Sequence, residues 1–195
     1  IELNSSEPYK LFKEYYDHAS SLDQKKIEAL AISSFNSSTS EVESRFVNLK
    51  YIINDEWIFF TNYNSPKSYD FQSHNQISAL FYWEKPDYQI RMKANIFKTA
   101  DEISDNHYMK RSFKKNVLAH ASNQSKKIKS YEDLKNKYTK MGTKKSLIEN
   151  RPNFWGGYSF KPYYFEFWKG HNDRVNQRTV YVKDNNFWTK YNLQP

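Results

Sequence analysis

The sequence predicts an antiparallel α+β domain, most simply a small β-barrel with helices packed at its ends. Three observations lead to this fold class. Segments with the alternation typical of strands lie in two blocks, 29–100 and 155–195, and a block with helical periodicity over 100–141 separates them. Strands and helices do not alternate regularly, as they do in a doubly wound sheet. Neither G-x-G-x-x-G nor G-x-x-x-x-G-K occurs, which excludes nucleotide binding through those loops.

Helices are predicted where apolar residues recur at helical spacing behind a suitable first residue. Pro8 lies near the start of the first predicted helix. In the second, Ser65 suits the N-cap and Pro66 suits the first helical position. The predicted helices span residues 7–19, 65–74, 100–111, 114–122 and 130–141.

Strands are predicted over short runs that are rich in aromatic and β-branched residues. The polar residues 36–40 supply the turn of one predicted hairpin, and from residue 155 onward strands return as four short runs. The predicted strands span residues 29–35, 41–53, 56–62, 77–83, 88–100, 156–160, 163–168, 179–182 and 186–191.

A length of 195 residues fits one domain, or one that completes itself by pairing with a copy, and we predict a single domain over 1–195. The absence of cysteine excludes disulfides and thiolate metal sites. The five histidines show no ligand-like spacing, so no metal site is expected. No apolar run approaches the ~18 residues of a membrane span, so we expect a cytoplasmic protein without a membrane partner.

The net charge of +8 is concentrated in one segment. Between Lys110 and Lys145, twelve Lys and Arg residues accompany only Glu132 and Asp133. Three interpretations are open: a solvated helix surface, a site for a phosphate-bearing ligand, and a nucleic-acid interface. The segment lacks the ordered aromatic and cationic pattern of a nucleic-acid interface, so no nucleic-acid partner is expected.

Three places combine polar or cationic residues with a geometry that suits a phosphate. Strand alternation puts Arg45 and Lys50 on opposite faces of one strand, which is unusual for a core strand, although two ends projecting to solvent give the same pattern. Lys67 follows a predicted helix N-terminus, where free N–H groups favour an anion, with an ordinary capped helix as the alternative. Gln124 and Ser125 are short polar donors beside two lysines, and an ordinary loop also explains them.

The segment 153–178 holds three of the four glycines, and nine aromatic residues lie within 154–168. Glycine serves where a backbone turns through positive φ or lets another group approach closely. The aromatic excess points to burial against a partner chain or a planar ligand, with core packing as the alternative. Arg174 and Arg178 follow in a loop, where they suit an anion or an aromatic ring, and an extended loop puts Asn176 on the same side.

Six motifs resemble those of the pyridoxamine 5′-phosphate oxidases. They occur in the same order and at close to the same spacing. The resemblance covers the chain from about Pro8 to Pro195, including the C-terminal strands that separate true members from other flavin split-barrel proteins. The motifs are RFVNLK (45–50), FFTNYNSPK (59–67), LFYW (80–83) followed by Gln89, ASNQS (121–125), FWGGYSF (154–160) and FEFWKGHNDRVNQR (165–178).

The resemblance implies an FMN-binding split barrel and a homodimer with two flavins at the subunit interface, to which the segment from about 153 to 195 contributes. It implies FMN-dependent oxidation of pyridoxamine or pyridoxine 5′-phosphate to pyridoxal 5′-phosphate, with O₂ as acceptor and release of H₂O₂. In such enzymes the flavin carries the redox chemistry, and the protein binds and orients. The glycines are then expected to let the backbone turn tightly as this segment crosses to the partner.

Site residues follow from the matching motifs. Arg45 and Lys67 suit the FMN phosphate, and Gln89 suits the polar edge of the isoalloxazine. The substrate contacts implied are Lys50, Tyr108 and Arg111 for its phosphate, and Arg174 and Asn176 as the catalytic residues beside its ring. The implied flavin contacts are Arg45, Phe46, Val47, Asn48, Leu49, Lys50, Phe60, Thr61, Lys67, Gln89, Gln124, Ser125, Trp168 and Arg178.

Four departures from the family pattern bear mostly on the substrate. Pro66 stands where an arginine usually precedes Lys67, and Asn176 stands where a histidine is usual. Lys115 falls where a phosphate-binding serine is expected, and the spacing from Tyr108 to Arg111 is one residue short. Two alternatives therefore stay open: an FMN oxidase of the same fold with a different substrate, and a non-catalytic protein that binds flavin or pyridoxal phosphate.

Overall fold

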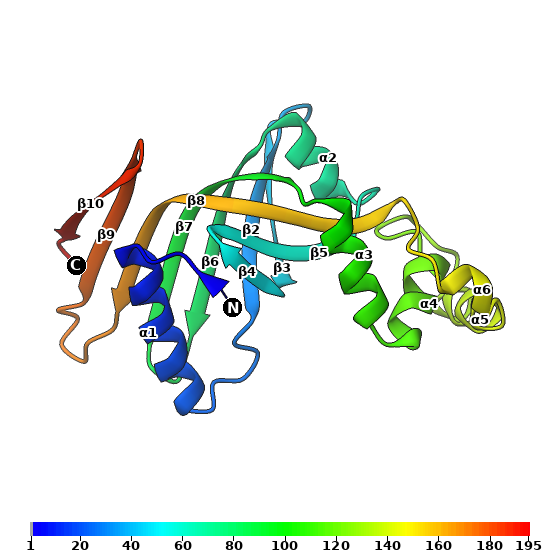
Figure 1. Ribbon diagram of the computed structural model, residues 1–195, viewed down its shortest axis with the longest axis horizontal. Coiled ribbons are helices and arrows are strands. Elements are labelled where there is room, and N and C mark those ends of the chain that lie inside the picture. The colour runs from blue at the N-terminus through cyan, green and yellow to red at the C-terminus, as the bar shows by residue number, and fades with distance from the viewer. Residues whose placement is uncertain (1) are drawn as a thin grey trace.

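A computed structural model describes residues 2–195, and it contains one ten-stranded sheet that curls into a barrel with helices around it (Figure 1). The strand order is β1-β4-β5-β8-β7-β6-β2-β3, and β8 also pairs with β9, which pairs with β10. All pairs are antiparallel except β1 with β4. The strands are β1 (Glu2–Leu3), β2 (Ala29–Asn36), β3 (Glu41–Asn48), β4 (Tyr51–Asn54), β5 (Glu56–Asn62), β6 (Gln76–Trp83), β7 (Tyr88–Lys98), β8 (Trp155–Lys169), β9 (Gln177–Asp184) and β10 (Phe187–Leu193).

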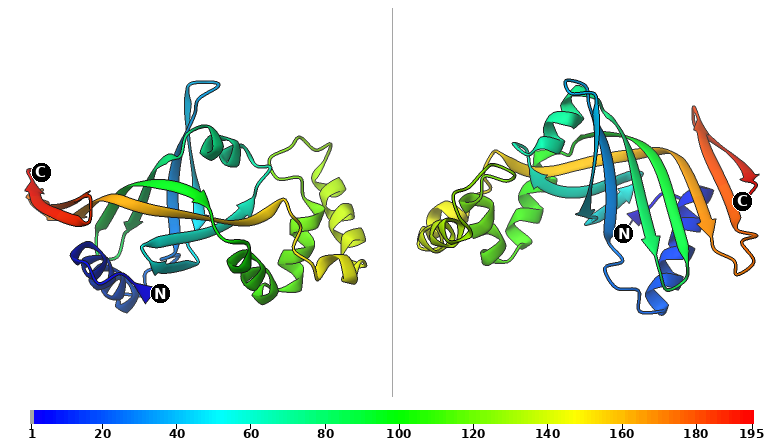
Figure 2. Two further views of the ribbon diagram at one scale, coloured as in Figure 1. Left: turned by 45° about the horizontal axis from the view of Figure 1, so that its top comes forward. Right: turned by 180° about the vertical axis from the view of Figure 1, so that it is seen from behind.

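The helices fall into three places. The helix α1 lies against one end of the barrel, α2 lies beside the β2–β3 hairpin, and α3 to α6 gather at the opposite side from β9 and β10 (Figures 1 and 2). The predicted helices are confirmed, and the structure adds α6, which the sequence pattern did not indicate. The helices are α1 (Glu7–Ser21), α2 (Pro66–Ser73), α3 (Asp101–Lys110), α4 (Phe113–Ala121), α5 (Tyr131–Gly142) and α6 (Lys145–Ile148).

The core is built mainly from aromatic rings, which explains how a chain with few aliphatic residues buries enough surface to fold. Phe12 of α1 meets Trp57 of β5 edge to face, with 4.6 Å between ring centroids. Tyr9, one turn earlier, meets Phe165 of β8 at 5.4 Å in the same manner. The i, i+3 spacing of Tyr9 and Phe12 therefore docks α1 onto the strands.

The predicted strand over 41–53 is wrong, because the chain breaks at Leu49 and Lys50 into β3 and β4. The strand β3 pairs with β2 and β4 pairs with β5, so the two lie toward opposite ends of the strand order. The Leu49 N–H donates to Glu28 O at 2.9 Å, and the Lys50 N–H donates to Ile58 O at 2.8 Å. Lys50 thus sits where the chain crosses from one end of the sheet to the other and closes the barrel.

The predicted pair of strands at 156–160 and 163–168 is also wrong, because β8 continues through both (Figure 1). Along one edge β8 pairs with β5 as far as Phe160 and with β9 from Tyr164. Pro162 lies in the gap between these partners, where a residue without an amide N–H is tolerated. The pairing with β7 shifts register between Lys93 and Ala94, which accommodates the extra residue of β8 there.

The glycines of this strand serve close packing, and the predicted tight turn is wrong. No described glycine has a positive φ. A Cβ added at Gly156 would overlap the Tyr63 hydroxyl, and one added at Gly157 would overlap the Thr99 methyl group. Gly170 likewise leaves room for the Asp87 carboxylate. Small residues are therefore required because neighbouring side chains cross directly over the strand.

Candidate active site

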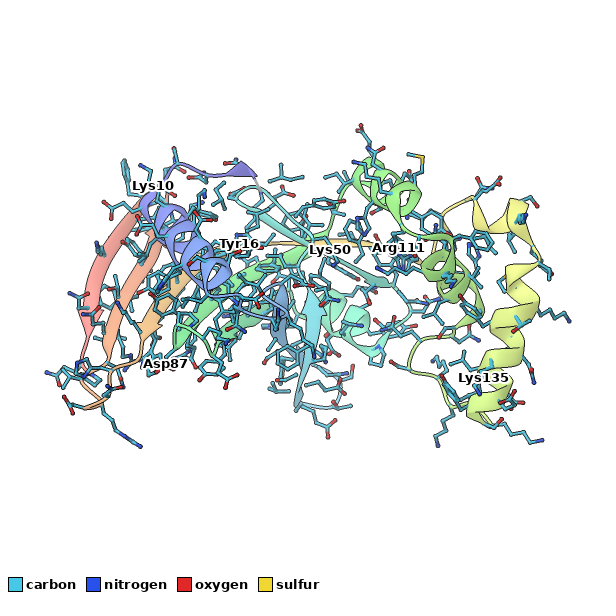
Figure 3. The ribbon with its side chains drawn as sticks, turned by 90° about the horizontal axis from the view of Figure 1, so that it is seen from below. Lys10, Tyr16, Lys50, Asp87, Arg111 and Lys135 are labelled. Atoms are coloured by element: carbon cyan, nitrogen blue, oxygen red, sulfur yellow. The ribbon has the colours of Figure 1, made fainter. Side chains whose placement is uncertain are left out.

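A cavity of about 610 Å³ opens between the barrel and the helices α3 and α4. The crossing at Lys50, the end of β5, the first turn of α2, the C-terminal end of α3 and the start of β8 supply its walls. Lys50 and Arg111 face it from the barrel and from the helices (Figure 3). Its lining is Phe46, Val47, Asn48, Lys50, Phe60, Thr61, Asn62, Lys67, His107, Lys110, Arg111, Ser112, Lys115, Leu118, Ala119, Ser122, Gln124 and Trp155.

The described lining contains five lysine or arginine side chains and no carboxylate. The cations come from four different places in the chain, so folding gathers them against their mutual repulsion. Such a wall attracts anions and holds them by charge-assisted hydrogen bonds. The basic segment beginning at Lys110 contributes three of these cations, which supports the interpretation of that segment as part of a phosphate site.

Lys67 is a buried cation in the lining of this cavity. It lies in the first turn of α2 with only 8% of its surface exposed, and its ammonium donates to Ser65 Oγ at 3.0 Å. Burial, followed by the charge of Arg45, lowers the pKa of Lys67 to about 8, although the charge of Asp70 partly opposes both. A buried ammonium beside a helix N-terminus fits a phosphate, because the phosphate would supply the missing counter-charge.

Arg45 lies behind this subsite and does not line the cavity. Its guanidinium donates to Ser34 Oγ at 2.6 Å and to Glu43 at 2.9 Å. The nearly fully buried Asp70 lies 3.7 Å from it and accepts from the Ser34 hydroxyl at 2.7 Å. Arg45 is therefore held by carboxylates and a hydroxyl of its own chain, and its charge acts on Lys67 from outside the cavity.

His107 is a cavity residue that the sequence analysis missed. Its Nδ1 lies 2.8 Å from the Tyr51 hydroxyl, and its ring stacks on Phe60. Burial, followed by the positive charges of nearby cations, lowers the pKa of His107 to about 4. The imidazole is consequently neutral at pH 7.

Tyr108, the predicted substrate contact, points away from the cavity. It is 1% exposed, its hydroxyl donates to Ile148 O at 2.8 Å, and His120 lies 3.1 Å away. The Tyr108 ring lies 5.9 Å from the Arg111 guanidinium, but His107 and not Tyr108 lines the cavity together with Arg111. The short spacing between Tyr108 and Arg111 was the signal that could have identified His107.

Arg111 is fixed by an aromatic ring and an amide. Its guanidinium lies 4.3 Å from the centroid of the Trp155 ring and donates to Asn116 Oδ1 at 3.2 Å. Lys115, the departure from the expected serine, lines the cavity one turn later. At this position the cavity therefore carries a cation where the family pattern has a neutral serine.

A second group of predicted residues lies at the other end of β8. Gln89 of β7 pairs with Trp168 of β8, and Trp168 pairs with Arg178 of β9, so the three form a row across the sheet. At ~3.3 Å per residue, Trp168 is roughly 40 Å along the strand from the cavity wall at Trp155. Within one chain these residues do not reach the cavity.

Arg178 is engaged with a buried carboxylate. Its Nη2 and Nε donate to one oxygen of Glu166 at 2.7 and 3.0 Å, and its Nη1 donates to Gln194 O at 3.0 Å. Arg91 donates to the other oxygen of Glu166 at 3.0 Å. Glu166 is 2% exposed, so this pairing fixes the plane of the Arg178 guanidinium.

The loop that carries Arg174 and Asn176 is not extended, which corrects the predicted common orientation. Arg174 has a φ of 60°, in the left-handed region, and its N–H donates to His171 O at 2.8 Å. The Asn176 Oδ1 accepts from the His171 N–H at 3.0 Å. Asn176 thus closes a turn, and Arg174 stays exposed at its tip.

Nine of the predicted residues line the cavity: Phe46, Val47, Asn48, Lys50, Phe60, Thr61, Lys67, Gln124 and Arg111. Leu49 and Ser125 are chain neighbours of lining residues and do not line it themselves. Leu49 packs against the hydrophobic core, and Ser125 has a φ of 65° in the loop after α4.

The chain is similar over its whole length to named oxidases. The chain is 34% identical over 196 residues to a pyridoxine/pyridoxamine 5′-phosphate oxidase of Colwellia psychrerythraea, and the match covers 100% of this chain and 90% of that protein. The chain belongs to the pyridoxine/pyridoxamine 5′-phosphate oxidase family. A relative of the same name from Cytophaga hutchinsonii is 37% identical, over 78% of this chain and 72% of that protein. Residues 155–195 match the model of the pyridoxine 5′-phosphate oxidase C-terminal dimerisation region.

Solved structures of the same fold extend over nearly the whole chain. PhzG from Burkholderia lata, solved in complex with tetrahydrophenazine-1-carboxylic acid, aligns with a TM-score of 0.91 at 27% identity, covering 97% of this chain and 93% of that one. A pyridoxamine 5′-phosphate oxidase-related, FMN-binding protein of Nostoc punctiforme aligns with a TM-score of 0.76 at 12% identity, over 98% and 100% of the two chains.

These similarities confirm the predicted family and the predicted α+β barrel. At the level of the family they also confirm the predicted enzyme class, a flavin oxidoreductase, and FMN as its cofactor. No helix in residues 2–195 is long and apolar enough to cross a membrane. The described residues contain no cluster of three or more histidine or carboxylate side chains that suits a metal ion.

Proposed function

We propose that this protein oxidises pyridoxamine or pyridoxine 5′-phosphate to pyridoxal 5′-phosphate with bound FMN, and that O₂ accepts the electrons and leaves as H₂O₂. The observation that carries the proposal is the cavity wall, which holds Lys67 in the first turn of α2, four further cations from other elements, and no carboxylate among its described residues. A flavin phosphate and a substrate phosphate are two separate anions. One cavity with two anion subsites therefore fits this pair of ligands.

In this proposal Lys67 and the first turn of α2 hold the FMN phosphate. The neutral donors Thr61 and Gln124 line the adjacent wall and suit the polar groups of the flavin. Phe60 lines the same cavity. Bound FMN would supply the two-electron acceptor, and the side chains of this chain supply binding, orientation and the exclusion of water.

The second group of cations holds the substrate phosphate. Lys50 reaches the cavity from the barrel closure, Arg111 reaches it from the residue that follows α3, and Lys115 reaches it from α4. Because the guanidinium of Arg111 already lies over Trp155 and is bonded to Asn116, it meets a phosphate with little further loss of freedom. Orientation of the substrate carbon toward the flavin accelerates a transfer that needs alignment more than proton movement.

We further propose that two copies of this single domain, residues 1–195, form a homodimer through the segment from about 153 to 195. Gln89, Trp168 and Arg178 lie roughly 40 Å along β8 from the cavity of their own chain. A two-fold arrangement would bring this row to the partner's cavity, where Trp168 and Arg178 contact flavin and Arg174 contacts substrate. The name of the matched family region, which refers to dimerisation, supports this arrangement.

A second candidate substrate class is a carboxylic acid. The structural neighbour PhzG was solved with tetrahydrophenazine-1-carboxylic acid, and this chain has asparagine at position 176. In this chain the Asn176 side chain accepts from the His171 amide, so it contributes to the turn rather than to proton transfer. The asparagine at position 176, where the family usually has a histidine, is the observation that favours a different substrate.

The test measures FMN binding, oligomeric state and turnover on the same protein. The purified protein is reconstituted with FMN, its visible spectrum and its mass in solution are recorded, and H₂O₂ release is measured with pyridoxamine and pyridoxine 5′-phosphate. We expect a yellow dimer that releases H₂O₂ with at least one of the two phosphates. A yellow protein without turnover of either phosphate would contradict the proposed substrate and leave the cofactor assignment intact. A protein that stays colourless would contradict both.

A further inference from the structure

The imidazole of His107 lies inside the anion-attracting wall of the cavity. Tyr51 of β4 holds its Nδ1, and the Phe60 ring of β5 covers one face at 3.8 Å between ring centroids. The second ring nitrogen, Nε2, has no hydrogen-bond partner among the described residues. His107 therefore presents one free nitrogen while the rest of its ring is fixed.

Charged groups approach His107 from three sides, and all of them are cations. Lys50 comes from the barrel closure that precedes β4, two more come from the C-terminal end of α3, and one comes from α4. The two aromatic neighbours on β5 and β8 carry no charge, and the Tyr51 hydroxyl is the one other titratable group in contact. The four cations whose charges act on the imidazole are Arg111, Lys50, Lys110 and Lys115.

In this arrangement the imidazole is neutral at pH 7, and an anion bound in the cavity would raise the pKa of His107. The pKa of about 4 results first from burial and then from the four cations, and no carboxylate of the described lining opposes them. An anion placed among the same cations reverses the second cause. A dianion reverses it about twice as strongly as a monoanion at the same position, because the Coulomb energy scales with the charge.

We propose that His107 is a specificity-determining residue that takes up a proton when a doubly charged anion binds, and so favours a phosphate monoester over a carboxylate. The proton comes from solvent and adds to the unprotonated ring nitrogen, so that both nitrogens become donors. One then donates to the Tyr51 oxygen, and the other donates to the anion. The proposal deepens the proposed function, because it distinguishes phosphate substrates from carboxylic acids at the same site.

Two anions of similar shape, sulfate and methanesulfonate, test the effect of the anion's charge on binding. Sulfate is a dianion and methanesulfonate a monoanion throughout pH 5–8, so neither titrates during the measurement. Their binding to the FMN-saturated protein is measured by calorimetry, which leaves the subsite at Lys67 occupied by the cofactor. The measurement requires no turnover, so a failure of the proposed oxidase activity is recognised separately by the H₂O₂ assay.

Between pH 7.5 and pH 5 we expect sulfate affinity to rise about tenfold, because proton uptake by the protein is linked to binding. We expect methanesulfonate affinity to rise by less than about twofold, because one charge offsets the surrounding cations less. His107→Gln should remove the difference between the anions, since glutamine retains a donor but does not titrate. His74→Gln, at a half-buried histidine outside this cavity, is the matched control and should retain the difference.

A second measurement on the unaltered protein covers the case in which His107→Gln does not fold. Sulfate binding at pH 5.5 is repeated in two buffers with different heats of ionisation, which counts the protons taken up. An uptake of roughly half a proton or more with sulfate, and much less with methanesulfonate, supports the proposal. Equal uptake with both anions, no uptake with sulfate, or an undiminished difference in His107→Gln would overturn it.

Discussion

The imidazole of His107 and the ring of Phe60 stack with 3.8 Å between their centroids and 8° between their planes. The Trp155 ring lies nearly parallel to both, at 5.5 Å from Phe60 and 6.2 Å from His107. Three elements, β5, α3 and β8, thus contribute one ring each to the same wall. This stack couples the helical segment to the barrel and gives the cavity a rigid apolar side beside its cationic side.

Replacement of Lys67 by alanine should weaken FMN binding by about tenfold or more, or ~1.4 kcal/mol, because the phosphate loses a buried charge-assisted partner. Flavin fluorescence measures the dissociation constant, since binding changes the emission of FMN. Lys10→Ala, at an exposed lysine of α1, is the control and should leave the constant unchanged. Equal effects of the two changes would argue against Lys67 as the phosphate contact.

The affinity for FMN should fall as the pH rises above about 8. Lys67 has a pKa of about 8 in the protein without ligand, so it is cationic below this pH and neutral above it. A bound phosphate raises this pKa, so binding above pH 8 requires uptake of a proton, and affinity falls by up to about tenfold per pH unit. Titrations from pH 7 to 9.5 should show the decline in the parent protein and not in Lys67→Ala.

Arg174 is expected to act on substrate and also to strain its own backbone. Arg174→Ala should lower kcat/KM for pyridoxamine 5′-phosphate by about two orders of magnitude, or roughly 2.7 kcal/mol, without release of FMN. Arg174→Gly should lose the same activity. Its free energy of unfolding should exceed that of Arg174→Ala by about 1 kcal/mol, because glycine accepts the φ of 60° without strain. Thermal unfolding measures the difference. An alanine variant as stable as the glycine variant would contradict the strain.

Two glycine-to-alanine changes should have opposite outcomes. Gly157→Ala places a methyl group against Thr99 and Phe60 and should destabilise the fold by about 1–3 kcal/mol. Gly142→Ala meets no atom within 4 Å and lies in the last turn of α5, so it should be neutral or stabilise by up to about 1 kcal/mol. Thermal unfolding measures both, and equal losses would refute close packing as the reason for Gly157.

The proposed homodimer predicts complementation between two inactive variants. Lys50→Ala removes a cation of the cavity, and Arg174→Ala alters the far end of the chain. If each site combines one cavity with the partner's C-terminal segment, co-expression should yield mixed dimers with one intact site, and about a quarter of all sites should be active. Activity no higher than that of either variant alone, or a monomer in light scattering at micromolar concentration, would reject the shared site.

Local pattern was sufficient wherever an element contacts its neighbours along its whole length. The strands predicted from the alternation in 77–83 and 88–100 are observed as β6 and β7, which bury every second residue and pair with each other. The apolar spacing of residues 7–19 similarly identified α1. The cavity residues Lys50, Lys67 and Arg111 were predicted from chemistry and motif and are gathered in the structure.

Local pattern failed where the chain changes partner. Residues 41–53 look like one strand, because every residue has strand character, but the break at Leu49 and Lys50 depends on hydrogen bonds to Glu28 and Ile58. The interruption expected near Pro162 does not occur, because the change of partner from β5 to β9 tolerates it. In both cases distant partners decide whether a strand continues.

The sequence by itself determined which chemistry this protein carries: its cations, its aromatic excess, its strand and helix periodicities and its family. The tertiary structure alone decided which of these groups meet, because side-chain direction depends on packing that spans the whole chain. One residue of helical rotation, about 100°, turns His107 into the cavity and buries Tyr108 behind it. The length of β8 likewise separates Trp168 from the cavity of its own chain, a distance that no local pattern encodes.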